Sequence, residues 1–157
     1  MWSCPQIAPL LDDSDVGVRK AAIETIAVFG SQGKAYEDQV AKLAQKDTEE
    51  GVRRVAVEFL KAMGSKATAI AGAIDLLKSE DVQTRQWATM QLSDLGDSLE
   101  ASAVEPLIAA LKDEDSMVKS NAILALGKMG SKASAATKAL KALVSDKEVG
   151  EFAKESL

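Results

Sequence analysis

The sequence predicts an all-α fold: a solenoid of about four and a half helical hairpins. A segment of about 33 residues recurs along the chain, and its apolar residues follow the 3.6-residue period of a helix. No stretch shows the alternation of apolar and polar residues that is typical of a strand. The composition agrees, because Ala, Leu, Lys and Glu dominate and aromatic residues make up only 4% of the 157 residues. These residue types lose little rotamer freedom in a helix.

The recurring segment has four full copies and one partial copy. The full copies begin at Asp15, Glu49, Asp81 and Asp115. The partial copy begins at Asp146 and keeps Val149 and Ala153. We expect the acidic residue that opens each copy to accept hydrogen bonds from the free N–H groups of a first helical turn. The start of each copy is therefore predicted to be the start of a helix.

Each copy contains one apolar helical stripe and is preceded by a second amphipathic run. In the first copy the stripe residues lie at i, i+4, i+8 and i+11, and they are Val18, Ala22, Ile26 and Phe29. A glycine follows each stripe, where we expect a left-handed residue to end the helix: Gly30, Gly64, Gly96 and Gly130. The preceding runs start at Pro9, Val40, Ala73, Pro106 and Ala139. Two helices per period predict hairpins that bury their apolar faces by stacking on their neighbours.

The repeats predict one domain over residues 1–157. Its boundaries are repeats at about 5–34, 35–67, 68–99 and 100–133, with a partial repeat at 134–157. Neither end has the polar cap that a solenoid needs. We therefore expect the chain to belong to a longer array or a larger complex, with Phe152 and Leu157 exposed at the C-terminal end.

The motif Asp-x-x-Val-Arg-x-x-Ala-x-x-x-Leu-x-x-x-Gly, preceded by Leu-Leu or an equivalent, resembles the second helix of HEAT repeats. The short period is similar to that of the HEAT-like repeats named after phycobilisome lyases. The resemblance covers nearly the whole chain, with departures such as Thr84 for Val and Lys119 for Arg. It implies a right-handed, armadillo-like superhelix whose second helices line a concave groove. It says little about activity, because proteins of unrelated function share this fold.

A cation follows the Val position in every full copy, at the edge of the apolar stripe. These cations are Arg19, Arg53, Arg85 and Lys119. Their stems are expected to pack on the core while their charged heads reach the turns between helices. The resemblance implies a ladder, meaning a row of ion pairs between neighbouring repeats, with the turn acids Asp15, Asp81 and Asp115. The alternative is an anion-binding row, but the acid at fixed spacing from each cation favours the ladder.

The opposite side of the second helices would face the groove that the resemblance implies. Repeats one and two place charged pairs there at i, i+4 spacing, Lys20 with Glu24 and Arg54 with Glu58. Repeats three and four place a more apolar set there: Gln86, Trp87, Met90, Met117, Ser120 and Leu124. Exposed apolar residues suit a contact patch, and Trp is a favoured anchor. We therefore predict that this set contacts a partner; the alternative is that Trp87 fills a gap between repeats.

Several kinds of chemistry are excluded by composition. The sequence contains no histidine and one cysteine, Cys4. Imidazole-based catalysis, imidazole or thiolate metal sites and an internal disulfide are therefore ruled out. The glycines follow helices and do not form a phosphate-binding loop. We predict no catalytic residue, no metal ligand and no cofactor.

The net charge and the absence of catalytic and metal-binding residue types together favour a binding protein. The net charge of −5 opposes binding to nucleic acid or to anionic membrane surfaces. No apolar run approaches the roughly 18 residues of a membrane span, and residues 1–5 lack the features of a signal peptide. A reducing compartment such as the cytoplasm is therefore expected. We predict a non-catalytic scaffold or adaptor that binds another protein through the groove or the uncapped ends. The alternatives are an accessory subunit of a bilin lyase or other modifying enzyme and, against the acidic charge, a nucleic-acid-binding HEAT-like protein.

Overall fold

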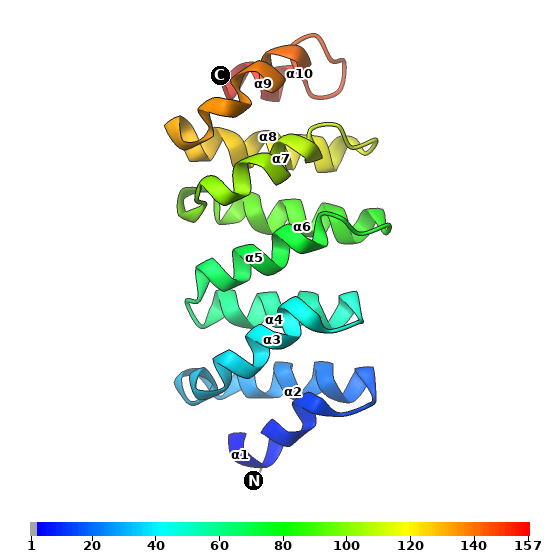
Figure 1. Ribbon diagram of the computed structural model, residues 1–157, viewed down its shortest axis with the longest axis vertical. Helices are drawn as coiled ribbons and strands as arrows, with labels where there is room; N and C mark the ends of the chain where they lie inside the picture. The colour runs from blue at the N-terminus through cyan, green and yellow to red at the C-terminus, as the bar shows by residue number, and fades with distance from the viewer. Residues whose placement is uncertain (1–2) are drawn as a thin grey trace. The chain divides into compact units, whose positions relative to one another are not determined.

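The computed structural model describes residues 3–157, and every regular element in this range is a helix. Met1 and Trp2, which belong to the segment considered for a signal peptide, lie outside the described residues. The chain divides into two compact units, Met1–Gly72 and Ala73–Leu157. Within each unit, helical hairpins follow one another as a stack (Figure 1). The predicted all-α class of stacked hairpins is confirmed.

Unit 1 contains the first two hairpins. Its helices are α1 (Cys4–Ile7), η1 (Ala8–Asp12), α2 (Val16–Val28), η2 (Gly30–Tyr36), α3 (Glu37–Lys46), α4 (Glu50–Ala62) and the first part of α5 (Lys66–Leu76). The short helix η1 packs on α2, and α3 packs on α4. Because α2 also contacts α4, one hairpin stacks directly on the next.

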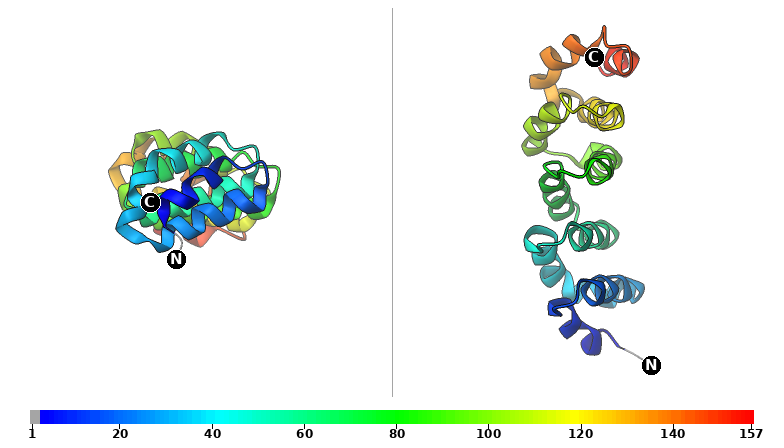
Figure 2. Two further views of the ribbon diagram at one scale, coloured as in Figure 1. Left: turned by 90° about the horizontal axis from the view of Figure 1, so that it is seen from below. Right: turned by 90° about the vertical axis from the view of Figure 1, so that its right-hand side faces the viewer.

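Unit 2 repeats this arrangement. After the end of α5 it contains α6 (Val82–Asp94), η3 (Gly96–Ser98), η4 (Ala101–Ala103), α7 (Val104–Ala110), α8 (Ser116–Met129), η5 (Gly130–Ala136), α9 (Thr137–Leu143) and α10 (Gly150–Glu155). The strongest packing joins α6 to α8, and α10 packs on both α8 and α9. In the right-hand view of Figure 2, α6, α8 and α10 form one layer of unit 2, and α7 and α9 form the other.

The acids that open the copies act as N-caps, as predicted. Asp15, Asp81 and Asp115 each accept a hydrogen bond from the backbone N–H three residues later, at 3.0, 2.8 and 2.9 Å. Glu49 occupies the same position before α4 but makes no side-chain cap bond. This agrees with the general preference for Asp over Glu at the N-cap, where a short side chain reaches the free N–H groups.

Three of the four predicted glycine stops are confirmed, and the fourth is a correction. Among the described residues, positive φ occurs at Gly30, Gly64 and Gly130, with values of 56°, 86° and 55°. Gly96 is not among them and begins the short helix η3. A Cβ atom at Gly96 would lie 2.5 Å from the Cβ of Lys128. The glycine is therefore needed there for the close approach of α8 and not for a left-handed turn.

The predicted apolar stripe forms the core of the second helices. In α4, Val52, Ala56 and Leu60 are fully buried, and the equivalent residues of α8 are 2% exposed or less. In the first copy Ala22 and Ile26 are buried, whereas Val18 is half-buried. Burial of this stripe in successive helices is what holds each hairpin on its neighbour.

Gly72 lies at a close contact between α5 and α4 and yields a stability prediction. A Cβ atom at this position would lie 2.6 Å from Cγ2 of Val57, so Gly72→Ala overpacks the contact between α5 and α4. We expect Gly72→Ala to lower the free energy of unfolding by about 2 kcal/mol, measured by chemical denaturation. Gly51→Ala in α4 is the matched control. Its nearest neighbour would be the Lys20 side chain at 3.8 Å, and the change should be neutral or stabilising. Equal stability of the two variants would contradict the prediction.

Candidate functional site

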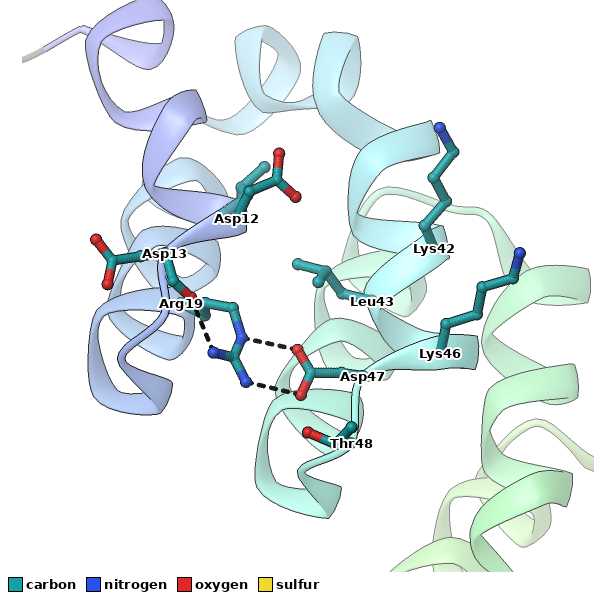
Figure 3. A pocket seen from close by; sticks show the side chains of 9 residues that line it. Asp12, Asp13, Arg19, Lys42, Leu43, Lys46, Asp47 and Thr48 are labelled. Atoms are coloured by element: carbon teal, nitrogen blue, oxygen red, sulfur yellow. Dashed lines mark hydrogen bonds and ion pairs between the residues drawn. The ribbon is translucent and has the colours of Figure 1, made fainter.

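An ion pair joins the two hairpins of unit 1 at their turns. Arg19 Nε and Nη2 donate to the two carboxylate oxygens of Asp47, at 2.8 and 2.9 Å. Its Nη1 donates to the backbone carbonyl of Asp13 at 2.9 Å. Figure 3 shows this guanidinium held between the turn that precedes α2 and the turn that follows α3. The bond is a bidentate, charge-assisted pair, the geometry for which arginine is suited.

Unit 2 contains the same kind of pair two hairpins later in the chain. Arg85 Nε and Nη2 donate to Asp113 at 2.8 and 3.2 Å, and Nη1 donates to the carbonyl of Ser79 at 3.0 Å. Lys119 continues the series with a looser contact, 3.8 Å from Asp146. The pairing of a second-helix cation with an acid in the next repeat therefore recurs within both units.

The acids in these pairs differ from the predicted ones, which is a correction. We expected Asp15, Asp81 and Asp115 to pair with the cations, whereas the bidentate partners of Arg19 and Arg85 are Asp47 and Asp113. The three predicted acids cap the N-termini of the second helices, and Asp115 also interacts electrostatically with Arg85. Asp47 and Asp113 lie two residues before the cap position, in the turn that reaches back toward the preceding repeat. Spacing alone does not identify these partners, because the residue 28 positions after Lys119 is Lys147.

Arg53 and Gln86 also form hydrogen bonds with acidic residues of the turns that precede the second helices. Arg53 donates to the carbonyl of Asp47 at 3.1 Å and lies 3.6 Å from Glu50. Gln86, which was predicted to contact a partner, donates its amide N–H to the carboxylate of Asp115 at 3.1 Å. Gln86 therefore contributes to the packing between α6 and the turn before α8.

A cavity of about 380 Å³ lies beside the pair in unit 1 (Figure 3). It is lined by Leu11, Asp12, Asp13, Arg19, Lys42, Leu43, Lys46, Asp47 and Thr48. Burial acts to raise the pKa of Asp47. The hydrogen bonds from Arg19 and from the Glu49 N–H outweigh it, and the pKa lies below its usual value. The three acids of the lining are balanced by Arg19 and the two lysines, so the cavity has no net preference for an anion or a cation.

The predicted groove residues of unit 1 form a charged surface. Glu24 and Glu58 are exposed, and Lys20 and Arg54, one helical turn before them, are half-buried. The i, i+4 spacing places each base and acid on the same side of its helix. This side of unit 1 offers charged side chains to a partner and few apolar ones.

The outer side of the second helices in unit 2 is apolar instead. Met90 on α6 and Met117 and Leu124 on α8 are 44%, 54% and 37% exposed. Phe152 on α10 is also exposed, and we had predicted it only as a chain-end residue. Because α8 packs on both α6 and α10, these residues lie on three successive helices of one layer. We call Met90, Met117, Leu124 and Phe152 the apolar face of unit 2.

Trp87 does not belong to this face, which corrects its predicted place among the partner-binding residues. Its side chain is only 8% exposed. Thr84 and Gln91, which lie one turn before and after it on the same side of α6, are buried as well. The large ring extends the core stripe of α6 to its edge, and the alternative reading of Trp87 as a residue that fills a gap in the packing fits this burial.

A cavity of about 250 Å³ opens between α8 and α10 within the apolar face. Its lining consists of Ser116, Met117, Ser120, Glu148, Val149 and Phe152. Ser120 donates its hydroxyl hydrogen to the carbonyl of Met117 at 3.1 Å, which leaves its oxygen lone pairs for another donor. Glu148 stands at the rim, 3.9 Å from Lys119. Ser120 and Met117 were predicted to contact a partner, and the structure brings both to this cavity.

The recurring hairpins, their capped second helices and the cation–acid pairs find a match in a known family. The family model described as HEAT repeats matches residues 4–93 and again residues 70–156. The chain belongs to this family. No curated protein matches it in sequence.

Solved structures share the fold at low sequence identity. A designed armadillo repeat protein, YIII(Dq)4CqI, is 20% identical, with a TM-score of 0.69 over 98% of this chain and 80% of that chain. Another, YIII(Dq.V1)4CPAF, solved in complex with peptide (KR)4, is 22% identical, with a TM-score of 0.68 over 96% and 79%. A chain from the complex of CpcE and CpcF of phycocyanin lyase from Nostoc sp. PCC7120 is 19% identical, with a TM-score of 0.67. That match covers 99% of this chain and 64% of the lyase chain. At these identities the likeness shows a common fold and nothing further.

No helix among residues 3–157 combines the length and the apolar character needed to cross a bilayer.

Proposed function

We propose that this chain is a non-catalytic scaffold that binds another protein on the apolar face of unit 2. HEAT and armadillo repeats typically act in this way, through the surfaces that their stacked helices present. The observation that supports this location is the exposure of Met90, Met117 and Leu124 in a row across α6 and α8.

Energetics favour this surface over the other outer surfaces of the second helices. Exposed apolar side chains that cluster across adjacent elements gain free energy when a partner removes them from water. The outer side of α2 and α4 presents Glu24 and Glu58 at the positions of Met90 and Leu124. Exposed charges of this kind contribute little to affinity and more to the rate and specificity of association. The apolar face is therefore the stronger candidate for the centre of an interface.

The proposal predicts that Leu124→Asp weakens partner binding without unfolding the chain. A buried charge at the centre of an interface should reduce the amount of bound partner about tenfold or more. The free energy of unfolding should change by less than about 1 kcal/mol, because the side chain is already partly in water. The partner is first identified by photo-cross-linking in a lysate of the source organism, with p-benzoylphenylalanine in place of Leu124. The amount of this partner that Leu124→Asp binds is then compared with the amount that the wild type binds, in a pull-down.

Val28 supplies the control position for this experiment. It is the most exposed large apolar side chain among the described residues, and it lies on α2 in unit 1 and is not part of the apolar face of unit 2. The same cross-linker at position 28 should give no product in common with position 124. A second control combines the cross-linker at position 124 with Met90→Asp, which should abolish the specific product. Identical products from positions 28 and 124 would disprove the proposal.

A further inference from the structure

Three kinds of side chain line the cavity between α8 and α10. Met117, Val149 and Phe152 supply apolar surface, Ser116 and Ser120 supply hydroxyl groups, and Glu148 supplies a carboxylate at the rim. An acidic ligand group would be repelled by Glu148. A purely aliphatic group would cover the carboxylate and the hydroxyls without bonding to them, at a cost in free energy. The lining therefore favours a side chain with an apolar stem and a cationic head.

We infer that this cavity binds an arginine side chain of the protein partner. The inference rests on the proposed function and specifies what the partner must present. The arginine stem lies along Met117 and Val149, and the guanidinium lies against the ring of Phe152. The guanidinium N–H groups donate to the carboxylate of Glu148 and to the hydroxyl oxygen of Ser120. Arginine fits better than lysine because its planar head stacks on an aromatic ring and donates in several directions at once.

The charged groups around the cavity favour the binding of an added cation. Lys119 is the basic group that contacts Glu148, at 3.9 Å, and it lies 3.8 Å from Asp146 as well. Two carboxylates thus share one ammonium group. Glu151 on α10 is paired with Lys154 at 2.6 Å, and Glu155 follows one turn later. With the exposed Lys147 included, the acids at positions 146, 148, 151 and 155 still outnumber the lysines at positions 119, 147 and 154 by one, so an arriving guanidinium meets an excess of negative charge.

The position of the cavity also constrains the partner segment. Neighbouring packed helices lie about 8 to 10 Å apart, and an extended chain advances about 3.3 Å per residue. A segment whose arginine enters the cavity therefore reaches Leu124 within about three residues and Met90 within about six. The expected ligand is a segment with one arginine and apolar side chains at these distances on one side of it.

The test uses the full chain, labelled with ¹⁵N, and N-acetyl-arginine N-methylamide as the probe. We expect amide chemical-shift changes that are confined to residues 116–120 and 148–153 and that saturate with concentration. The neutral isostere N-acetyl-citrulline N-methylamide should bind about fivefold more weakly, since it lacks the charge that Glu148 attracts. The lysine analogue should also bind more weakly. Equal binding of the citrulline compound, or shifts spread over the surface, would overturn the inference.

Substitutions of two lining residues separate the contribution of the Glu148 charge to binding from that of the Phe152 ring. Glu148→Gln should weaken binding of the arginine probe about fivefold, and Phe152→Ala should weaken it by a similar factor. Glu114→Gln is the matched control, because Glu114 is exposed in the turn before α8 but does not line the cavity. An unchanged affinity in Glu148→Gln and Phe152→Ala would overturn the arginine site. The cross-link from position 124 is a separate readout. Partner capture that persists at the wild-type level in Glu148→Gln would leave the proposed function standing without the arginine site, and a wild-type chain that gives no specific product from position 124 would remove both.

Discussion

Trp87→Ala is expected to lower the free energy of unfolding by about 3 kcal/mol. The side chain is buried at the edge of the core of α6, which also contains the fully buried Ala88 and Leu92, so truncation leaves a cavity in this core. Truncation of a buried aromatic side chain costs about 3 to 5 kcal/mol, and the lower value applies at the edge of a core. The measurement is guanidinium denaturation followed by circular dichroism, because the substitution removes a fluorescent group.

Met90→Ala is the matched control for this prediction. Met90 lies three residues after Trp87 on the same helix but is 44% exposed. Its truncation should change the free energy of unfolding by less than about 1 kcal/mol while reducing partner binding. The two variants thus distinguish core from interface on one helix. If the Trp87→Ala protein is stable but binds the partner less well, Trp87 belongs to the apolar face and not to the core.

Asp47→Asn is expected to cost about 2 kcal/mol of stability at pH 7, through loss of the charge-assisted hydrogen bonds from Arg19. The cost should depend on pH. Although burial opposes ionisation, the bonds from Arg19 and from the Glu49 N–H lower the pKa of Asp47 below its usual value. A carboxyl whose pKa is lowered by folding stabilises the folded state above its unfolded pKa of about 4, and the stabilisation disappears as the pH falls through the folded-state pKa. The wild type and Asp47→Asn should therefore converge in stability as the pH falls through the lowered pKa of Asp47 in the folded state.

Asp12→Asn is the control for the pH experiment. Asp12 lines the same cavity, but its side chain is exposed at the end of η1. Its substitution should change the free energy of unfolding by less than about 0.5 kcal/mol at pH 7. If Asp47→Asn and Asp12→Asn lose stability equally, or if the Asp47→Asn difference is the same at pH 3 and pH 7, the ion pair does not contribute as described.

The starts of the second helices and their apolar stripes follow from local rules and could be predicted from the sequence. Asp15, Asp81 and Asp115 cap helices because a short carboxylate reaches free N–H groups three residues ahead, a relation within one turn of chain. The burial of Val52, Ala56 and Leu60 follows from their common side of one helix. The exposure of Met90, Met117 and Leu124 follows from the same periodicity.

The cation partners, the role of Gly96 and the place of Trp87 depended on neighbours that are distant in sequence. Arg19 could meet acids at several spacings, and only the stacking of α2 beside the turn after α3 selects Asp47. Gly96 resembles the other helix-ending glycines in sequence. In the structure, the close approach of Lys128 on α8 leaves no space for a side chain at this position. A helical wheel places Trp87 at the border between core and surface, and the packing around α6 decides that it is buried. Periodicity and capping are local properties, so the sequence alone determined the repeats, whereas the pairings and cavities between repeats were decided by which faces the stacked helices bring together.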